Sequence, residues 1–131
     1  MKYLLDTHVW IWWSMAPERL SAKVKRLIQG LKYEEILLSA ISVWEFCKLL
    51  EKGRLEISCD TEEWIREALD MDRLRVVPLV PEISYKSTVL PQPFHDDPAD
   101  QIIFAIAREE KATILTKDAR IHSYTKVKSA W

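Results

Sequence analysis

The sequence predicts a single α/β domain, with a parallel sheet of about four to five strands between two layers of helices. Short apolar runs alternate with longer segments of helical periodicity, two strand-like runs lead into an aspartate and a helix, and no linker or repeat interrupts the order. Alternating strands and helices favour parallel pairing with right-handed crossovers. We expect one domain over residues 1–131, because this length and an apolar content of 48% suffice for one core.

In the first half of the chain, apolar runs mark the strands, and capping or breaking residues mark the helix ends. The first strand ends at Asp6, and Pro17 stops the helix that follows it. Ser21 precedes an amphipathic helix whose basic residues lie opposite its apolar face. The expected elements are strands at 2–5 and 35–39 and helices at 7–15, 22–31 and 42–50.

In the second half, Asp60 or Thr61 caps a helix and Pro81 starts a shorter one. Two prolines then form a rigid approach to the next helix. This approach carries His95, which at such a position is more often a surface or hydrogen-bonding residue than a base. The expected elements are helices at 62–71, 81–90 and 98–107, strands at 75–79 and 112–115, a helical turn at 119–122 and a last edge strand ending at Val127.

The segment 94–107 carries more negative charge than a helix start needs. Asp97 fits the N-cap, Pro98 the first helical position and Asp100 the third. The run at 102–107 is almost wholly apolar, which places Asp100 at the edge of the core. Two explanations stay open for Asp100: the helix dipole, worth about 0.3–1 kcal/mol, or a metal ion. Asp97 is first a cap and second an outer partner of that metal.

Three further acids occupy comparable positions. Asp6 and Asp118 lie beyond the ends of strands, and Glu45 lies near a helix start. Structural explanations exist, because Ser42 and Glu45 fit a capping box and Asp118 fits the N-cap of a short turn. In parallel sheets, however, ligand sites lie beyond the carboxyl ends of the strands, where the following helices also begin. We therefore expect all three acids to face Asp100.

Carboxylates brought together in this way need a cation. At ~5 Å and an effective dielectric constant of about 20, each like-charged pair repels by about 3 kcal/mol. Lys117 and Arg120 are near in the sequence, yet an all-oxygen cluster suits Mg²⁺ or Mn²⁺ best. Such an ion holds a phosphate oxygen and lowers the pKa of a bound water, which favours hydrolysis of phosphodiesters.

The composition excludes several other classes. The net charge of −1 gives no global attraction to nucleic acid, so such binding must depend on local basic residues or on a metal. Cys47 and Cys59 lack CxxC spacing, and two glycines cannot build a Gly-rich phosphate loop. Because Asp6 and His8 interrupt the apolar N-terminal residues, we expect no signal peptide or membrane span, and a cytoplasmic protein with reduced thiols.

Tryptophan is abundant on the first predicted helix. Trp10, Trp12 and Trp13 have spacings that no single buried stripe accommodates. Either neighbouring elements cover these rings, or part of their surface is left for a partner. On the second explanation we expect Trp10 at a protein interface, with Trp44 and Trp64 extending it.

The chain resembles PIN-domain nucleases, most closely VapC-type toxins of toxin–antitoxin pairs, through LLDTHVWIWW, SAISVWE, HDDPADQIIFAIA and TILTKDARI in this order. The resemblance spans essentially the whole chain. It implies a Mg²⁺- or Mn²⁺-dependent endoribonuclease with RNA as substrate, usually a homodimer, held inactive by a cognate antitoxin. It also implies that Asp6, Glu45, Asp100 and Asp118 are catalytic, and that Asp6, Asp100 and Asp118 bind the metal.

Two positions depart from the pattern of this family. His8 stands where many relatives have a small polar residue, and Gln101 follows the third acid where close relatives often have arginine. The acidic quartet is unaffected. A guanidinium that could bind phosphate is missing beside Asp100, which leaves open how substrate is held there.

Other function classes fit less well. A phosphatase of the haloacid dehalogenase type needs a second aspartate two residues after the first, where this chain has His8. A phosphoacceptor receiver domain needs paired early acids and a lone aspartate after its third strand, and the chain has neither. The remaining alternative is a catalytically silent PIN-like module that binds metal and partners. Its best signature is a lost acid, and none is lost here.

Overall fold

The computed structural model describes residues 1–31, 35–71 and 74–131. Its strands are β1 (Tyr3–Leu5), β2 (Ile36–Ser39), β3 (Leu74–Val77), β4 (Thr113–Leu115) and β5 (Ser129–Ala130). Its helices are α1 (Thr7–Met15), α2 (Ala22–Gly30), α3 (Ala40–Glu51), α4 (Thr61–Leu69), α5 (Pro81–Thr88), α6 (Pro98–Glu110) and α7 (Ala119–Ser123), with a 3₁₀ helix η1 at Pro17–Arg19.

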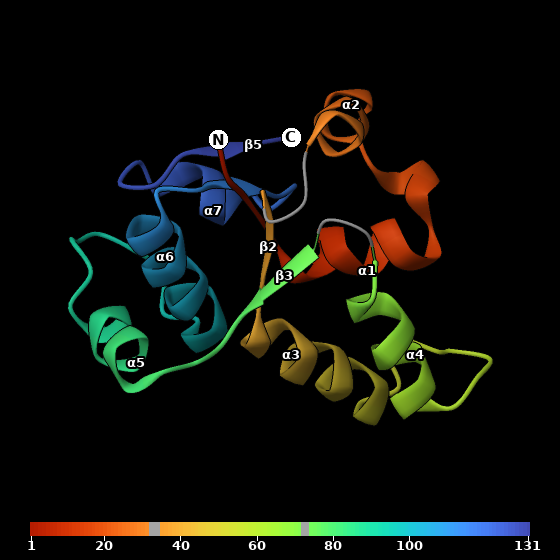
Figure 1. Cartoon of the computed structure of the whole chain (residues 1–131). Helices are drawn as coiled ribbons and strands as arrows, with labels where there is room; N and C mark the ends of the chain where they lie inside the picture. The colour runs from red at the N-terminus through yellow and green to blue at the C-terminus, as the bar shows by residue number, and fades with distance from the viewer. Residues whose placement is uncertain (32–34, 72–73) are drawn as a thin grey trace.

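Within the described residues, the five strands form one parallel sheet in the order β3-β2-β1-β4-β5. Helices cover both of its faces, with α5 and α6 on one side and α1, α2 and α4 on the other (Figure 1). The predicted three-layer α/β architecture is therefore confirmed. None of the helices in the described segments has both the length and the apolar composition needed to cross a membrane.

The central strand β1 distributes its side chains between two cores. Leu4 and its neighbours in register, Leu37 and Ile114, point to the layer formed by α5, α6 and α7. Leu5 and Leu38 point to the opposite layer, which contains α1, α2 and α4 and the buried side of α3. Because both faces are covered, the central strands β1 and β2 are almost wholly apolar, as buried parallel strands usually are.

Several predicted boundaries differ from the structure by a few residues, such as β3, which is Leu74–Val77 and not 75–79, and two of the differences bear on the argument. The last strand does not end at Val127, because β5 lies at Ser129–Ala130 and its backbone accepts the Thr116 N–H. Helix α3 begins at Ala40 rather than at Ser42, because the Ser39 hydroxyl already accepts the Ile41 N–H and caps the helix. The second difference matters for the interpretation of Glu45.

The prediction that Trp10 lies at a protein interface is wrong, because its side chain is fully buried. Its ring packs edge-on against Phe46 and Trp64, with centroids 5.9 and 5.3 Å away. Its indole N–H donates to the carbonyl of Ala68 at 3.2 Å, so the polar atom has a partner inside the core. The sides of α1 that carry Trp10 are covered by α3 and α4, as the alternative explanation requires.

Candidate active site

Asp6 is fixed at the junction of the central strand and the first helix. It follows β1 directly and caps α1, and its Oδ1 accepts the Thr7 N–H at 2.8 Å. Its Oδ2 accepts a hydrogen bond from the Thr116 hydroxyl, also at 2.8 Å. Asp6 is 7% exposed, so this carboxylate is held in one orientation at the bottom of the site.

Thr116 joins Asp6 to Asp118. It follows β4, is fully buried, and its Oγ1 also accepts the backbone N–H of Asp118 at 3.0 Å. Asp118 caps α7, because its Oδ1 accepts the Arg120 N–H at 2.8 Å. The sequence-based cap at Asp118 is confirmed, and the same geometry places its carboxylate beside Asp6.

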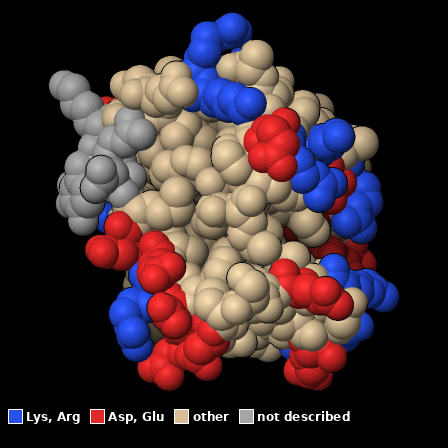
Figure 2. Space-filling view, turned by 90° about the vertical axis from the view of Figure 1, so that its right-hand side faces the viewer, with Lys and Arg blue, Asp and Glu red and all other residues tan. Residues whose placement is uncertain are grey.

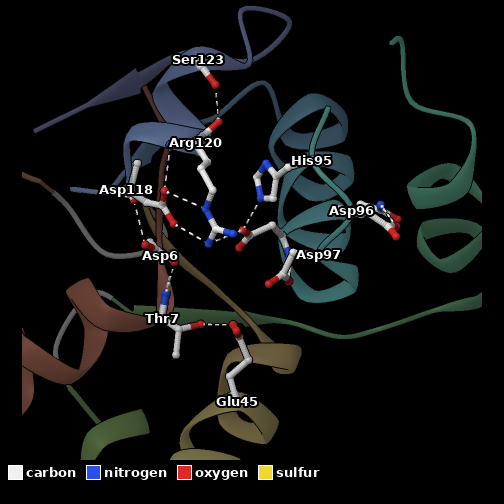
Figure 3. Close-up of polar contacts among 12 residues, drawn as sticks. Asp6, Thr7, Glu45, His95, Asp96, Asp97, Asp118, Arg120 and Ser123 are labelled. Carbon is white, nitrogen blue, oxygen red and sulfur yellow. Dashed lines mark hydrogen bonds and ion pairs between the residues drawn. The ribbon is translucent and has the colours of Figure 1, made fainter. Parts of the chain in front are cut away.

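Glu45 points from α3 toward the start of α1 (Figure 3). Its Oε1 accepts a hydrogen bond from the Thr7 hydroxyl at 2.5 Å, and the same hydroxyl lies 2.8 Å from Ser42 Oγ. The capping box proposed for Ser42 and Glu45 is wrong, because α3 has already begun and both side chains are engaged with Thr7. The local structural explanation for Glu45 is thereby removed.

Asp100 lies in the first turn of α6 and is 6% exposed. The cap predicted at Asp97 is confirmed, because its Oδ1 accepts the Asp100 N–H at 3.0 Å. Asp100 Oδ2 is 2.5 Å from His95 Nε2, and the His95 ring packs edge-on against Phe104. His95 therefore contacts an acid of the quartet, which its position before the helix does not predict.

Arg120 places a cation among the acids. Its Nη2 lies 3.1 Å from Asp118 Oδ2 and 4.0 Å from Asp100 Oδ2. Figure 3 shows the Arg120 guanidinium directed toward the Asp118 carboxylate. The Arg120 side chain is 62% exposed, so it reaches the acids from the solvent side. Gln101 is directed elsewhere, toward Asp96, and the guanidinium missing at position 101 is thus supplied from α7.

The acids of the quartet perturb one another electrostatically. Burial, followed by repulsion from Asp100, Asp6 and Asp97, raises the pKa of Glu45 to about 7, although the Thr7 hydrogen bond opposes this. Burial, followed by repulsion from Asp97 and Asp6, raises the pKa of Asp100 to about 6 against the effect of His95. Burial also raises the pKa of Asp6, with a smaller contribution from Asp118. Each of these three acids is therefore close enough to at least one other acid of the site to affect its pKa.

Asp118 differs from the other three acids. Burial acts to raise its pKa, but hydrogen bonds from the Arg120 side chain and backbone outweigh this and lower the pKa below its ordinary value. The same contact, followed by attraction to Asp100 and Asp97, raises the pKa of Arg120. The adjacent Arg120 guanidinium therefore stabilises the ionised form of Asp118.

The possible metal ligands of the site are the carboxylate oxygens of its acids. In the described part of the chain, no three His, Cys, Asp or Glu side chains are grouped closely enough to hold one. Asp100 and Asp118 are separated by the Arg120 guanidinium, which already occupies a position that favours positive charge. Carboxylate oxygens suit a hard divalent ion, and the exposed Arg120 side chain can move without disturbing the core. The donor atoms of Asp6, Asp100 and Asp118 are therefore of the type that such an ion prefers, whereas their side chains are not grouped around one point in the described structure.

Sequence patterns missed two residues that organise the site. Thr7 and Thr116 each place a hydroxyl between two functional groups, Thr7 between α1 and Glu45 and Thr116 between Asp6 and Asp118. The available signal was a threonine beside each strand end that carries an acid. Threonine is common at such positions, so the pattern alone does not distinguish this role.

Comparison with known proteins gives consistent matches. The PIN domain family model matches residues 3–127. Ribonuclease VapC22 from Mycobacterium tuberculosis is 34% identical over 121 residues, which are 92% of this chain and 90% of that protein. The structure of VapBC2 from Rickettsia felis bound to a promoter DNA fragment has a TM-score of 0.68 at 15% identity, covering 99% of this chain and 98% of that chain. A toxin–antitoxin complex from Klebsiella pneumoniae has a TM-score of 0.65 at 19% identity, covering 94% and 92%.

The metal-free protein should lose stability as the pH rises from about 4.5 to 7, because the pKa of Glu45 rises over this range on folding. A group whose pKa is raised by folding stabilises the protein below its unfolded-state pKa, and this contribution is lost as the pH passes the folded-state value. Glu45→Gln cannot ionise, so its melting temperature should fall less than that of the wild type between about pH 5 and pH 8. The measurement is thermal unfolding in EDTA, with exposed Glu56→Gln as control. Parallel curves for wild type and Glu45→Gln would contradict the raised pKa.

Proposed function

The chain belongs to the PIN-domain family, and from this premise we propose that it is an endoribonuclease and the toxin of a toxin–antitoxin pair. The curated relative described above is a ribonuclease by name, and the solved structures similar in fold include toxin–antitoxin complexes. The observation that carries the proposal is the convergence of Asp6, Glu45, Asp100 and Asp118 at the carboxyl end of the sheet. A catalytically silent module would not need all four acids in this place.

We propose Mg²⁺ or Mn²⁺ as the cofactor, held by Asp6, Asp100 and Asp118. When bound, such an ion neutralises charge on the phosphate and makes water a stronger nucleophile at neutral pH. Other side chains of the protein hold these three carboxylates in position. The Thr116 hydroxyl aligns Asp6 with Asp118, and His95 holds one oxygen of Asp100, so that the carboxylates cannot turn away from the site.

Glu45 and Arg120 take complementary roles beside these ligands. The Thr7 hydroxyl orients the Glu45 carboxylate, and a pKa of about 7 allows Glu45 to accept a proton from the attacking water near neutral pH. Arg120 can bind a phosphate oxygen through its planar guanidinium when it leaves Asp118. Both side chains act on the phosphodiester from the solvent side of the buried aspartates.

We propose that the antitoxin binds the apolar groove on α1. This groove of about 400 Å³ is lined by Ile11, Trp12, Met15 and Leu55, among others. On the side of the molecule that includes α4 and the segment after α3, Figure 2 shows a broad uncharged area with basic and acidic side chains around its edges. Trp12 rather than Trp10 is the tryptophan available there. A homodimer is proposed on the family resemblance alone.

Asp6→Asn and Asp100→Asn should each reduce RNA cleavage by more than about a hundredfold, because each removes a metal-binding charge and keeps the volume. The fold should survive, since asparagine can also cap α1 at position 6. Cleavage of total RNA in Mn²⁺ and far-ultraviolet circular dichroism measure the two properties. Asp70→Asn, which changes an exposed aspartate at the end of α4, is the control. Wild-type cleavage rates in either site variant would show that the active site is assigned wrongly.

Arg120→Gln should bind Mn²⁺ about two- to fivefold more tightly than the wild type, because an exposed ion pair that competes with the metal is removed. Calorimetric titration of the metal-free protein gives the affinity without any need for activity. Arg66→Gln, which removes an arginine that is also exposed and ion-paired but lies on α4, should leave the affinity unchanged. If Arg120→Gln bound Mn²⁺ more weakly, the guanidinium would be supporting the metal site and not competing for it.

A further inference from the structure

Helix α3 carries a large aromatic side chain directly beside the catalytic acid. Phe46 is fully buried on α3 and stacks on Trp64 with ring centroids 4.0 Å apart, whereas Trp44 on the same helix is 55% exposed. Trp44 is the neighbour of Glu45 in the sequence. The helix thus buries one of its aromatic rings and presents another to solvent at the edge of the active site.

A cleft of about 250 Å³ joins Trp44 to the acids. Its lining includes Thr7, Glu45 and Asp97, which belong to the candidate active site. It also includes Trp44 and three basic residues, Lys48, Lys52 and Arg54, together with His8 and Leu49. The same cleft therefore brings carboxylates of the candidate site together with cations and an exposed ring.

The cations of this cleft are largely available to a ligand. Lys48 Nζ lies 5.8 Å from the centroid of the Trp44 ring and forms an exposed ion pair with Glu51 at 3.1 Å, a type of contact that contributes little. In the part of the chain that the structure describes, neither Lys52 nor Arg54 has a salt bridge. Within the described residues, the charges of Lys52 and Arg54 are therefore not neutralised by an ion pair.

An exposed aromatic ring flanked by cations is the arrangement that binds single-stranded nucleic acid. Bases stack on the ring, and the charged side chains contact the phosphates on either side. We propose that this cleft is a substrate subsite, in which Trp44 stacks with one base of the RNA while Lys48, Lys52 and Arg54 bind the adjoining phosphates. This inference rests on the proposed ribonuclease function and adds the residues that position the strand next to the cleaved bond.

Charge favours RNA over a protein in this cleft. A symmetric contact with a second copy of the chain would bring the same three cations against one another. An apolar antitoxin segment would find here only Trp44 and Leu49 among mainly charged and polar groups, whereas the groove on α1 offers several apolar side chains. A polyanion with aromatic bases uses both the ring and the cations.

The test is fluorescence anisotropy with a labelled single-stranded RNA of mixed sequence, about 12 nucleotides long, in EDTA so that no cleavage occurs. Trp44→Ala should weaken binding by about tenfold or more, and Trp44→Phe should retain most of the affinity because it keeps an aromatic face. Tyr85→Ala, which removes a 65% exposed aromatic side chain from α5, is the matched control and should have no effect.

A second RNA with abasic sugars identifies the stacking contact. The wild type should bind it more weakly, and Trp44→Ala should cause little further loss, because the base that Trp44 contacts is absent. Lys52→Gln should weaken binding to both RNAs by a similar factor, since a phosphate contact does not depend on the base.

The proposal is overturned if the wild type does not bind RNA in EDTA, if Trp44→Ala binds like the wild type, or if the loss is equal on the abasic RNA. A Trp44→Ala variant that changes only the oligomeric state, measured by sedimentation, would assign the cleft to contact between copies and also overturn it. Cleavage by the wild type in Mn²⁺ is measured separately. Cleavage with no effect at Trp44 refutes only the subsite, whereas no cleavage of any RNA refutes the proposed function.

Discussion

The repulsion among buried carboxylates at one edge of the sheet is the constraint on which the site depends. A parallel sheet directs the ends of all its strands to the same side, so Asp6 and Asp118 meet there, and α3 and α6 bring Glu45 and Asp100 to the same place. Burial prevents water from screening these charges. Burial, with a smaller contribution from this repulsion, raises the pKa values of Asp100 and Glu45 to about 6 and 7, so protons or a cation stabilise the arrangement.

Two kinds of group act on these carboxylates: buried or half-buried groups that are fixed, and an exposed side chain that can move. Buried or half-buried groups fix the geometry: the Thr7 and Thr116 hydroxyls and the His95 ring each hold one carboxylate. An exposed group supplies charge: Arg120 lies between Asp100 and Asp118 and can leave. The first set gives the site its shape, whereas the second leaves room, in our proposal, for a metal ion to replace the positive charge of the guanidinium.

Whether the place of a residue could be predicted from the sequence depends on whether local or distant contacts determine it. Strand ends and helix caps depend on local residues, so the places of Asp6, Asp97 and Asp118 could be predicted. Trp10 could not, because α1 is apolar on nearly all sides and its periodicity does not show which rings α3 and α4 cover. The contacts of Arg120 could not be predicted from the sequence either. An exposed side chain has many rotamers, and acids from distant segments determine its direction here.

The central claim is that these acids, held at the sheet edge by the fold, form a site for a divalent ion that displaces an internal cation. The most direct test is a crystal structure of the protein grown with Mn²⁺, using the anomalous signal of the metal. The account predicts an anomalous peak bounded by Asp6, Asp100 and Asp118, with the Arg120 side chain moved away from Asp100. Crystals that contain Mn²⁺ elsewhere, or none, while Arg120 keeps its contacts with both acids, would contradict it.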